Sequence, residues 1–279
     1  MNRAEHAQRA IECLREAIPA PETELSYTDP YELIVAVILS AQCTDERVNM
    51  VTPALFAAFP TVHEMARAEP EDVLPYIASI SFPNNKSNHL VRMARRVVDE
   101  FGGKIPDTIN ELITLQGVGR KTAQVVASVA FNRDALPVDT HVFRVANRLG
   151  LARKADTPLK VERQLKSVVS KDTWSDAHHL LILHGRYTCT ARSPKCESCT
   201  ARPVCRYYES LQRLPDRMDA LNAKLGRFYC KTRDHYFDEP DLHTDRYGTA
   251  QVCCPSCGSM NVFNAKTGVS TKKVRDYRV

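Results

Sequence analysis

Eight of the ten cysteines lie in the last third of the chain, where they form two clusters; the other two are Cys13 and Cys43. The chain begins with a charged, amphipathic segment instead of a signal peptide, and no stretch is long and apolar enough to cross a membrane. We therefore expect a cytoplasmic protein whose thiols are kept reduced. Clustered thiols in a reducing compartment favour metal binding over disulfide pairing. Part of the fold is thus expected to form around metal.

Before the first cysteine cluster, the sequence predicts a series of helices. Apolar residues recur at helical spacing, turns containing proline separate the segments, and no alternating strand pattern is found up to residue 185. The run Leu33–Leu39 is apolar on all sides, and Asp29 and Pro30 supply a cap and a first turn before it, so it is expected to be a buried helix. With 279 residues, 43% of them hydrophobic, the chain can form an all-α body with a sizeable core.

A turn with two glycines, Gly117 and Gly119, joins a helix that begins after Thr108 to a helix that ends near Phe131. Glycines at this spacing allow a tight turn with exposed amides, and the N-terminus of the following helix adds further N–H groups. Such a turn can bind a phosphate group, and the adjacent Arg120 adds positive charge. The alternative is an ordinary corner in which the glycines only let the helices pack. The net charge of +5 is compatible with a polyanionic partner but does not identify one.

Lys121 begins the second of these helices, and Asp139 precedes another amphipathic helix further along the chain. An unprotonated amine can attack an electrophilic carbon and form an imine, and nearby cations such as Arg120 favour the unprotonated state. A carboxylate has the opposite effect, so Asp139 is better suited to stabilising positive charge on a substrate. Taken singly, Lys121 could instead be a phosphate contact and Asp139 a helix cap.

The first cysteine cluster has the spacing C-x6-C-x2-C-x5-C and consists of Cys189, Cys196, Cys199 and Cys205. Four thiolates suit zinc or an iron–sulfur cluster, and the internal C-x2-C fits either metal. The loop between the first two cysteines carries Arg192 and Lys195, which could contact a DNA phosphate if metal orders the loop. The alternative is a purely structural loop with solvated charges.

Together these motifs resemble those of the endonuclease III family, over about residues 1–210. The string Leu115–Ala123 resembles the helix–hairpin–helix of base-excision glycosylases, Val138–His141 matches the family's next motif, and the cysteine spacing resembles a [4Fe–4S] loop. The resemblance implies a bifunctional DNA glycosylase/AP lyase that excises oxidised pyrimidines and cuts the strand 3′ to the abasic site by β-elimination. It also implies that Lys121 forms the Schiff base and that Asp139 is the essential acid.

Two further segments bear on how a damaged base leaves the duplex. Leu39–Asp45 resembles the family's LSAQxTD segment, which implies that Gln42 enters the space vacated by the base. The family's second wedge is an aliphatic residue, and the corresponding stretch here offers Phe82 as an aromatic wedge, with Pro83 where a tyrosine is usual. Without the resemblance, Gln42 would be a polar residue at a helix end and Phe82 a core residue.

The expected architecture is two helical lobes with a small extension. One lobe spans residues 22–133 and carries the hairpin, the other combines residues 1–21 with 134–211 and carries the cluster, and residues 212–279 form the extension. The expected partner is double-stranded DNA with damaged bases or abasic sites, bound by a monomer at the nucleoid. No membrane partner is expected.

The extension has its own composition. Residues 206–225 are charged and helical in pattern, Gly226 interrupts that pattern, and residues 227–279 are aromatic and polar. Cys254 and Cys257 form one knuckle typical of a zinc ribbon, while Cys230 and His235 are an incomplete second half, for which Cys253 is an alternative. The extension is therefore either a zinc-ribbon-like module or an appendage with free thiols. The final basic residues, which could contact DNA or form a solvated tail, are Lys272, Lys273, Arg275 and Arg278.

Two other functions compete with the main hypothesis. The first is an adenine mismatch DNA glycosylase, a relative with the same iron–sulfur cluster; Lys121 and the lack of a large second recognition domain count against it. The second is a non-catalytic DNA-binding clamp that retains the hairpin, and the presence of both Lys121 and Asp139 disfavours it.

Overall fold

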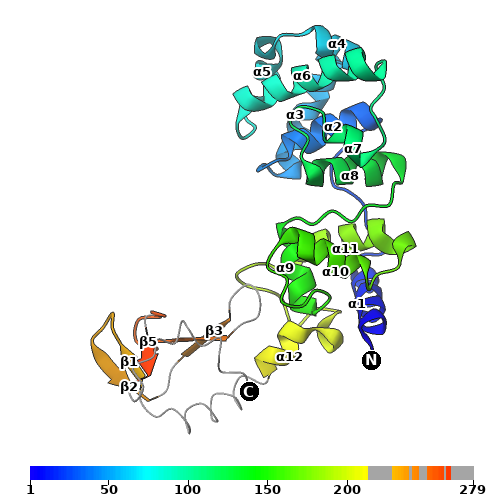
Figure 1. The fold of residues 1–279 in the computed structure, drawn as a ribbon. Helices are drawn as coiled ribbons and strands as arrows, with labels where there is room; N and C mark the ends of the chain where they lie inside the picture. Colours follow the sequence, from blue (N-terminus) through cyan, green and yellow to red (C-terminus); the bar gives the residue numbers. More distant parts are fainter. Residues whose placement is uncertain (213–227, 239–240, 245–249, 261, 265–279) are drawn as a thin grey trace. The chain divides into compact units, whose positions relative to one another are not determined.

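The computed structural model describes residues 1–212, 228–238, 241–244, 250–260 and 262–264. The first of these ranges is helical, as the sequence predicts (Figure 1). Its helices are α1 (Arg3–Ala17), α2 (Pro30–Leu39), α3 (Asp45–Ala58), α4 (Val62–Arg67), α5 (Pro70–Ile77), α6 (Pro83–Phe101), α7 (Ile109–Leu112), α8 (Arg120–Phe131), α9 (Thr140–Leu149), α10 (Pro158–Lys166), α11 (Trp174–Tyr187) and α12 (Arg206–Gln212), with 3-10 turns η1 (Lys171–Thr173) and η2 (Arg202–Val204). Among the described helices, none is long and apolar enough to cross a bilayer.

Backbone contacts divide the chain into two compact units. The hairpin unit, as we call it, consists of Ile18–Asp139 and Lys166–Leu183, and so contains α2 to α8 and most of α11. The cysteine-loop unit consists of Met1–Ala17, Thr140–Leu165 and the chain from His184 onward. An N-terminal helix therefore belongs with later parts of the chain, and within this unit the ring of His6 on α1 contacts the carbonyl oxygen of Val204 in η2 at 2.8 Å.

Helix α2 is the centre of the hairpin unit. Eight of its ten residues are buried, and α3, α6 and α8 pack around it. The Asp29 side chain caps it by accepting the N–H of Glu32 at 2.8 Å, and the Glu32 carboxylate accepts the N–H of Thr28 at 2.7 Å. Burial of each large apolar side chain contributes about 1.5–3 kcal/mol, so the all-apolar run is stable only when it is surrounded. The buried, capped helix predicted from the sequence is confirmed.

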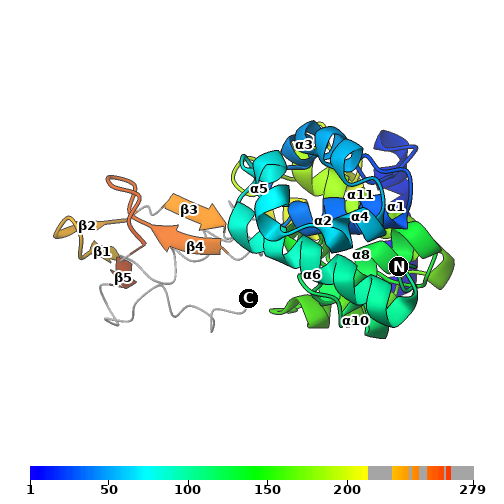
Figure 2. The same cartoon turned by 90° about the horizontal axis from the view of Figure 1, so that it is seen from above.

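The described residues beyond α12 form two small antiparallel sheets. The first sheet has the strand order β2 (His235–Phe237), β1 (Phe228–Cys230) and β5 (Val262–Asn264). The second pairs β3 (Asp241–Thr244) with β4 (Ala250–Cys253), which lie side by side in Figure 2. Helix α12 covers the start of the helical pattern predicted for residues 206–225. The rest of that pattern and the basic residues 272–278 lie outside the described ranges.

Candidate active site

Helices α7 and α8 and the turn between them form a helix–hairpin–helix. Thr108 caps α7 by accepting the N–H of Glu111 at 3.3 Å, and α8 begins directly after Gly119. The buried Val118 closes the turn, because its N–H donates to the carbonyl oxygen of Leu115 at 3.1 Å. The two helices are thus joined by a short, internally bonded turn, as the sequence predicts.

The two glycines of this turn differ in what they require. Gly117 has φ +80°, and a Cβ atom there would lie 2.9 Å from the Cβ of His89 on α6, so no other residue fits without strain. Gly119 has φ −84°, and a Cβ atom would meet nothing within 4 Å. The glycine at 119 is therefore not needed by the conformation of the protein itself. Its open side lies at the N-terminus of α8, where backbone N–H groups and the helix dipole favour an anion.

Lys121 and Asp139 come together in the hairpin unit. The Lys121 Nζ lies 3.9 Å from the Asp139 Oδ2. About half of the lysine side chain is exposed (53%), whereas the aspartate side chain is largely covered (13% exposed). The amine is therefore accessible to a large ligand, and a shielded carboxylate lies beside it. Because a carboxylate favours nearby positive charge, this pair can stabilise a cation that forms next to the amine.

Two buried histidines of α11 lie near Asp139. The Nδ1 of His178 is 2.9 Å from the carbonyl oxygen of Pro137, and the rings of His178 and His179 are 5.0 Å apart between centroids. Burial, with a smaller contribution from His179, lowers the pKa of His178 well below its ordinary value. The ring is therefore neutral at pH 7 and donates its Nδ1 proton to the carbonyl, which fixes the backbone two residues before Asp139.

The loops that carry Gln42 and Phe82 are adjacent. The Ser81 hydroxyl donates to the carbonyl oxygen of Gln42 at 2.8 Å. Gln42 and Phe82 both adopt the left-handed backbone conformation, with φ +56° and +58°, which is unfavourable for residues with a side chain. Gln42 is exposed and Phe82 is 58% exposed, so the alternative of Phe82 in the core is wrong. Both side chains point away from the core from one pair of loops.

A buried lysine joins these two loops. The Nζ of Lys86, on the first turns of α6, donates to the carbonyl oxygens of Leu39 and Ala41, at 2.7 Å each. Only 5% of Lys86 is exposed, and burial lowers its pKa. Lys86 therefore connects the end of α2 to the start of α6, close to both candidate wedge residues.

The first cysteine cluster surrounds one small cavity in the cysteine-loop unit, lined by Cys189, Cys196, Cys199 and Cys205 together with Leu149 and Tyr207. The loop between the first two cysteines is internally bonded, since the N–H of Lys195 donates to the carbonyl oxygen of Thr188 at 2.9 Å. Arg192 and Lys195 are exposed on this loop. The four cysteines therefore line one space, with the exposed Lys195 at its edge and Arg192 exposed on the same loop.

Two buried arginines of α9 make this cavity suitable for an anionic metal group. Arg148 donates to the Cys189 Sγ at 3.4 Å and to the carbonyl oxygen of Thr190 at 2.7 Å, while Arg144 donates to the Cys189 carbonyl oxygen at 3.1 Å. The Nε of Arg148 is buried and has no hydrogen-bond partner among the described residues. Two guanidinium cations in a buried position require nearby negative charge, which four thiolates on a metal group would supply.

The cavity is also defined by the protonation of its thiols and by a nearby histidine. Burial raises the pKa of Cys196 and Cys199, and it raises the pKa of Cys205 to about 11. Thiols of this kind remain protonated at pH 7 unless a metal ion displaces the protons. The His184 Nε2 lies 3.7 Å from the Cys199 Sγ. The donor set therefore fits a metal group held by thiolates, with an imidazole beside it.

Several of these supporting residues were not anticipated from the sequence. Lys86, Arg144, Arg148 and His178 are polar residues on helices, and each is buried. The spacing of Arg144 and Arg148 by four residues on the same side as the apolar residues of α9 was the one available signal. The structure also brings together Cys230, His235 and Cys254 of the extension.

Comparison with known proteins places this site in a family. The family described as "HhH-GPD superfamily base excision DNA repair protein" matches residues 35–171. Endonuclease III of Rickettsia conorii is 42% identical over 209 residues, which cover 75% of this chain and 99% of that protein. Endonuclease III of Escherichia coli K12 is 41% identical over 211 residues, covering 76% of this chain and 99% of that protein.

Solved structures give the same result. A trapped covalent intermediate of endonuclease III with DNA superposes with a TM-score of 0.72 at 40% identity, covering 76% of this chain and all of that one. The fold and the site therefore define a helix–hairpin–helix protein of base excision DNA repair. More narrowly, the chain belongs to the endonuclease III family, whose members are DNA glycosylases with AP lyase activity. The fold class and the enzyme class predicted from the motifs are confirmed.

Proposed function

We propose that this protein is a bifunctional DNA glycosylase/AP lyase that excises oxidised pyrimidines from double-stranded DNA and then cuts the strand. The observation that carries the proposal is the Lys121–Asp139 pair, with 3.9 Å between Nζ and Oδ2, beside the hairpin. A solvent-accessible amine next to a shielded carboxylate supplies the nucleophile and the negative charge that the reaction needs. The trapped covalent complex of an endonuclease III with DNA, at 40% identity, supports covalent chemistry in a close relative.

The first chemical step is displacement of the damaged base. The unprotonated Nζ of Lys121 attacks the anomeric carbon of the sugar, the bond from that carbon to the base breaks, and the base leaves with the bonding electrons and a proton. Positive charge develops on the sugar during this step, and the Asp139 carboxylate stabilises it electrostatically. The neutral His178 keeps the segment before Asp139 in position through its bond to Pro137. The alternative function, a non-catalytic DNA-binding clamp, would require neither the Lys121 amine nor the Asp139 carboxylate.

The second step is strand cleavage. The amine of Lys121 remains bound to the sugar carbon as an imine after the ring opens, and the imine makes the neighbouring hydrogen acidic by accepting electrons. Removal of that proton expels the phosphate on the 3′ side, which cuts the strand by β-elimination. Water then hydrolyses the imine and releases Lys121. A single lysine thus serves both the glycosylase and the lyase reaction.

The remaining site residues position the DNA. The open backbone at Gly119, the turn at Gly117 and the Arg120 guanidinium bind a phosphate of the damaged strand without reading its sequence. Gln42 and Phe82 enter the space left by the extruded nucleotide, and their adjacent exposed positions support that role. Such DNA is chromosomal, so the protein acts in the cytoplasm at the nucleoid.

The cluster loop has a structural role in this function. The four cysteines from 189 to 205 bind a [4Fe–4S] cluster, for which their number, spacing and common cavity provide the ligands. The bound cluster supplies a rigid centre for the loop rather than electrons for the reaction. Arg144 and Arg148 compensate the thiolate charge, and the ordered loop presents Arg192 and Lys195 to a DNA phosphate.

Borohydride trapping tests the proposal. With a duplex that contains a single thymine glycol or an abasic site, borohydride should reduce the imine and give a covalent protein–DNA adduct. Lys121→Ala should lose the adduct and at least about 10³-fold of the cleavage rate, because it removes the nucleophile. Lys104→Ala, which changes another exposed lysine of the hairpin unit, should retain both. An adduct that persists in Lys121→Ala, or release of adenine instead of the oxidised base, would contradict the proposal.

A further inference from the structure

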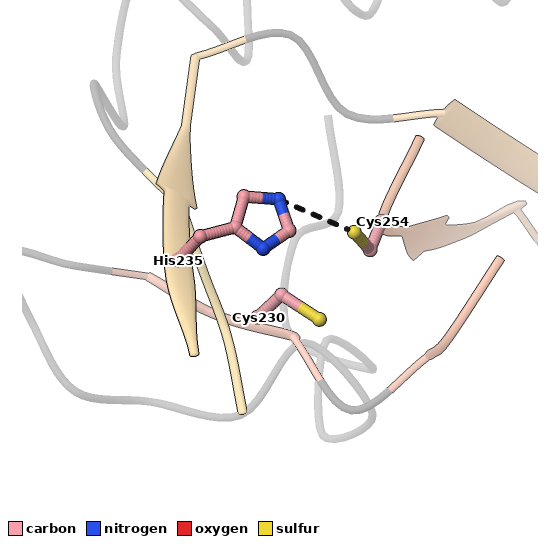
Figure 3. A group of neighbouring side chains, drawn as sticks. All are labelled: Cys230, His235 and Cys254. Atoms are coloured by element: carbon pink, nitrogen blue, oxygen red, sulfur yellow. Dashed lines mark hydrogen bonds between the residues drawn. The ribbon is translucent and has the colours of Figure 1, made fainter. Parts of the chain in front are cut away.

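Three potential metal ligands of the extension converge at one point. Cys230 ends β1 and His235 begins β2, and these two residues are direct partners in the antiparallel pairing of the strands. The ligand atoms of Cys230, His235 and Cys254 all lie within 4.8 Å of one another. Figure 3 shows these three side chains gathered at the end of the strands. The thiols of Cys230 and Cys254 are on buried residues, and the imidazole is half-buried. Two buried thiols and a half-buried imidazole that lie together in so small a module need a shared bonding partner.

Cys254 opens a tight turn that also brings Cys257 to this point. The N–H of Gly258 donates to the Cys254 carbonyl oxygen at 2.7 Å, and the N–H of Cys254 donates to the carbonyl oxygen of Ser259 at 2.9 Å. Gly258 has φ +65°, a conformation that glycine adopts without strain. The Sγ of Cys257 lies 3.8 Å from the Sγ of Cys230. The turn therefore presents two thiols toward the end of the β1–β2 hairpin.

The distances between these atoms match tetrahedral zinc. Zinc binds thiolate sulfur at about 2.3 Å and imidazole nitrogen at about 2.0–2.1 Å, so tetrahedral angles separate two sulfurs by about 3.8 Å and a sulfur from a nitrogen by about 3.5 Å. The observed separations are 3.8 Å for the Cys230 and Cys257 sulfurs and 3.7 Å for the Cys254 sulfur and the His235 Nε2. We propose that Cys230, His235, Cys254 and Cys257 bind one structural zinc ion.

Cys253 is not part of this site. Its thiol donates to the carbonyl oxygen of Asp241 on β3 at 3.3 Å. Cys253 is the last residue of β4 and Cys254 follows it, and the two thiols have different partners: the Asp241 carbonyl oxygen for Cys253 and the His235 ring for Cys254. The ligand set is therefore three thiols and one imidazole, a closed set of the kind found in structural zinc sites, with no position left for a substrate. Binding releases the protons of the thiols, which makes it weaker at acid pH.

The small core of the module explains why it needs the ion. Among its described residues, a buried cluster consists of Phe228, Cys230, Val252, Cys254 and Val262, and Cys253 is buried beside it. Two of the five residues of the cluster are proposed ligands, so the described part of the module buries three fully apolar side chains, far fewer than a domain without metal or disulfides requires. Zinc ligation supplies the stabilisation that the apolar core lacks. Because 75% of this chain covers 99% of the Rickettsia relative, about a quarter of the chain has no counterpart there.

Metal analysis of the purified full-length protein, combined with X-ray absorption at the zinc edge, tests the proposal. The wild type should contain about one zinc, bound by about three sulfurs near 2.3 Å and one nitrogen near 2.0 Å. This absorption spectrum is specific for zinc, and so it is independent of the iron in the same molecule and of whether any variant folds. No bound zinc after expression with zinc, or a shell of four sulfurs, which would indicate zinc in the loop from Cys189 to Cys205, would overturn the proposal.

Two variants identify the ligands. The double variant Cys254→Ala/Cys257→Ala should lose the zinc while its iron content stays at the wild-type level. Cys253→Ala changes the neighbouring buried thiol and should keep the zinc, because that thiol bonds to Asp241. Zinc retained in the double variant would contradict the assignment.

Discussion

The two cysteine clusters of this protein occupy very different surroundings. Around the first cluster, the helices have an apolar core that does not include the cluster's cysteines, and two buried arginines contact the loop that carries the thiols. Around the second, the described sheet residues bury three apolar side chains besides the ligands. On the proposed assignments, the first metal group is added to a packed helical structure, whereas in the extension zinc takes the place of an apolar core. The two parts of the chain should therefore differ in how much their folding depends on metal, and this dependence can be measured.

The largest expected effect is that of zinc removal on the extension. In zinc-finger peptides the apparent binding free energy is about 10–16 kcal/mol at pH 7, which is also their folding free energy. Stripping zinc with a chelator should therefore abolish hydrogen-exchange protection in the strands of residues 228–264. Peptides from α2 and α8 should retain theirs, as the core of the hairpin unit is apolar. Hydrogen-exchange mass spectrometry, with iron measured in the same sample, provides the readout. Unchanged protection in the strands would mean that the extension does not depend on zinc more than the helical units depend on their metal.

The second effect concerns the charge behind the first cluster. Arg148→Met keeps the length of the side chain but removes a buried cation, so the loop should lose iron and the protein about 3–5 kcal/mol of unfolding free energy. Arg153→Met, at an exposed position of the same unit, should change stability by less than about 0.5 kcal/mol. Denaturant titration with iron analysis compares the two variants. Equal stability would mean that the arginine does not compensate cluster charge.

The third effect separates stability from DNA binding within the hairpin. Gly117→Ala should destabilise the protein by about 1–3 kcal/mol, because φ is +80° and the new Cβ meets His89. Gly119→Ala should cost less than about 1 kcal/mol but weaken binding to abasic-site DNA, because the added methyl group occupies the open side of the backbone. Denaturation and a DNA-binding titration test the pair. If Gly119→Ala bound DNA as tightly as the wild type, the phosphate would lie elsewhere.

The smallest effect is a dependence of stability on pH. Burial lowers the pKa of His178 in the folded state, so below pH 6.5 the unfolded chain binds a proton that the folded chain does not. Stability should fall by about 1–2 kcal/mol between pH 7 and pH 5 from this group alone. His178→Asn, which keeps a donor toward the Pro137 carbonyl, should flatten the profile. An unchanged slope in that variant, measured by denaturant unfolding at each pH, would assign the effect to other groups.

Local features of the sequence were sufficient for much of the fold. The cap at Asp29, the apolar run of α2, the cap at Thr108 and the two glycines of the hairpin all act within a few residues, and each lies where it was expected. These features also placed Lys121 at a helix start. A sequence pattern works here because helix caps and tight turns have local causes.

The buried polar residues could not be predicted in the same way. Arg148, Lys86 and His178 are covered because carbonyl oxygens or thiols from distant parts of the chain surround them. A single sequence does not reveal such partners, and an isolated cation on a helix is usually exposed. The short strands described in the extension were likewise not predicted as strands, because each has only three or four residues, too few to show a clear alternating pattern.

The location of the covalent bond tests the central claim most directly. The wild-type protein is trapped with borohydride on abasic-site DNA, digested, and examined by tandem mass spectrometry. A single sugar remnant on the Nζ of Lys121 is the predicted result, since that amine lies 3.9 Å from the carboxylate of Asp139 and is open to solvent. A remnant on another lysine or on the N-terminal amine, with Lys121 unmodified, would contradict the account.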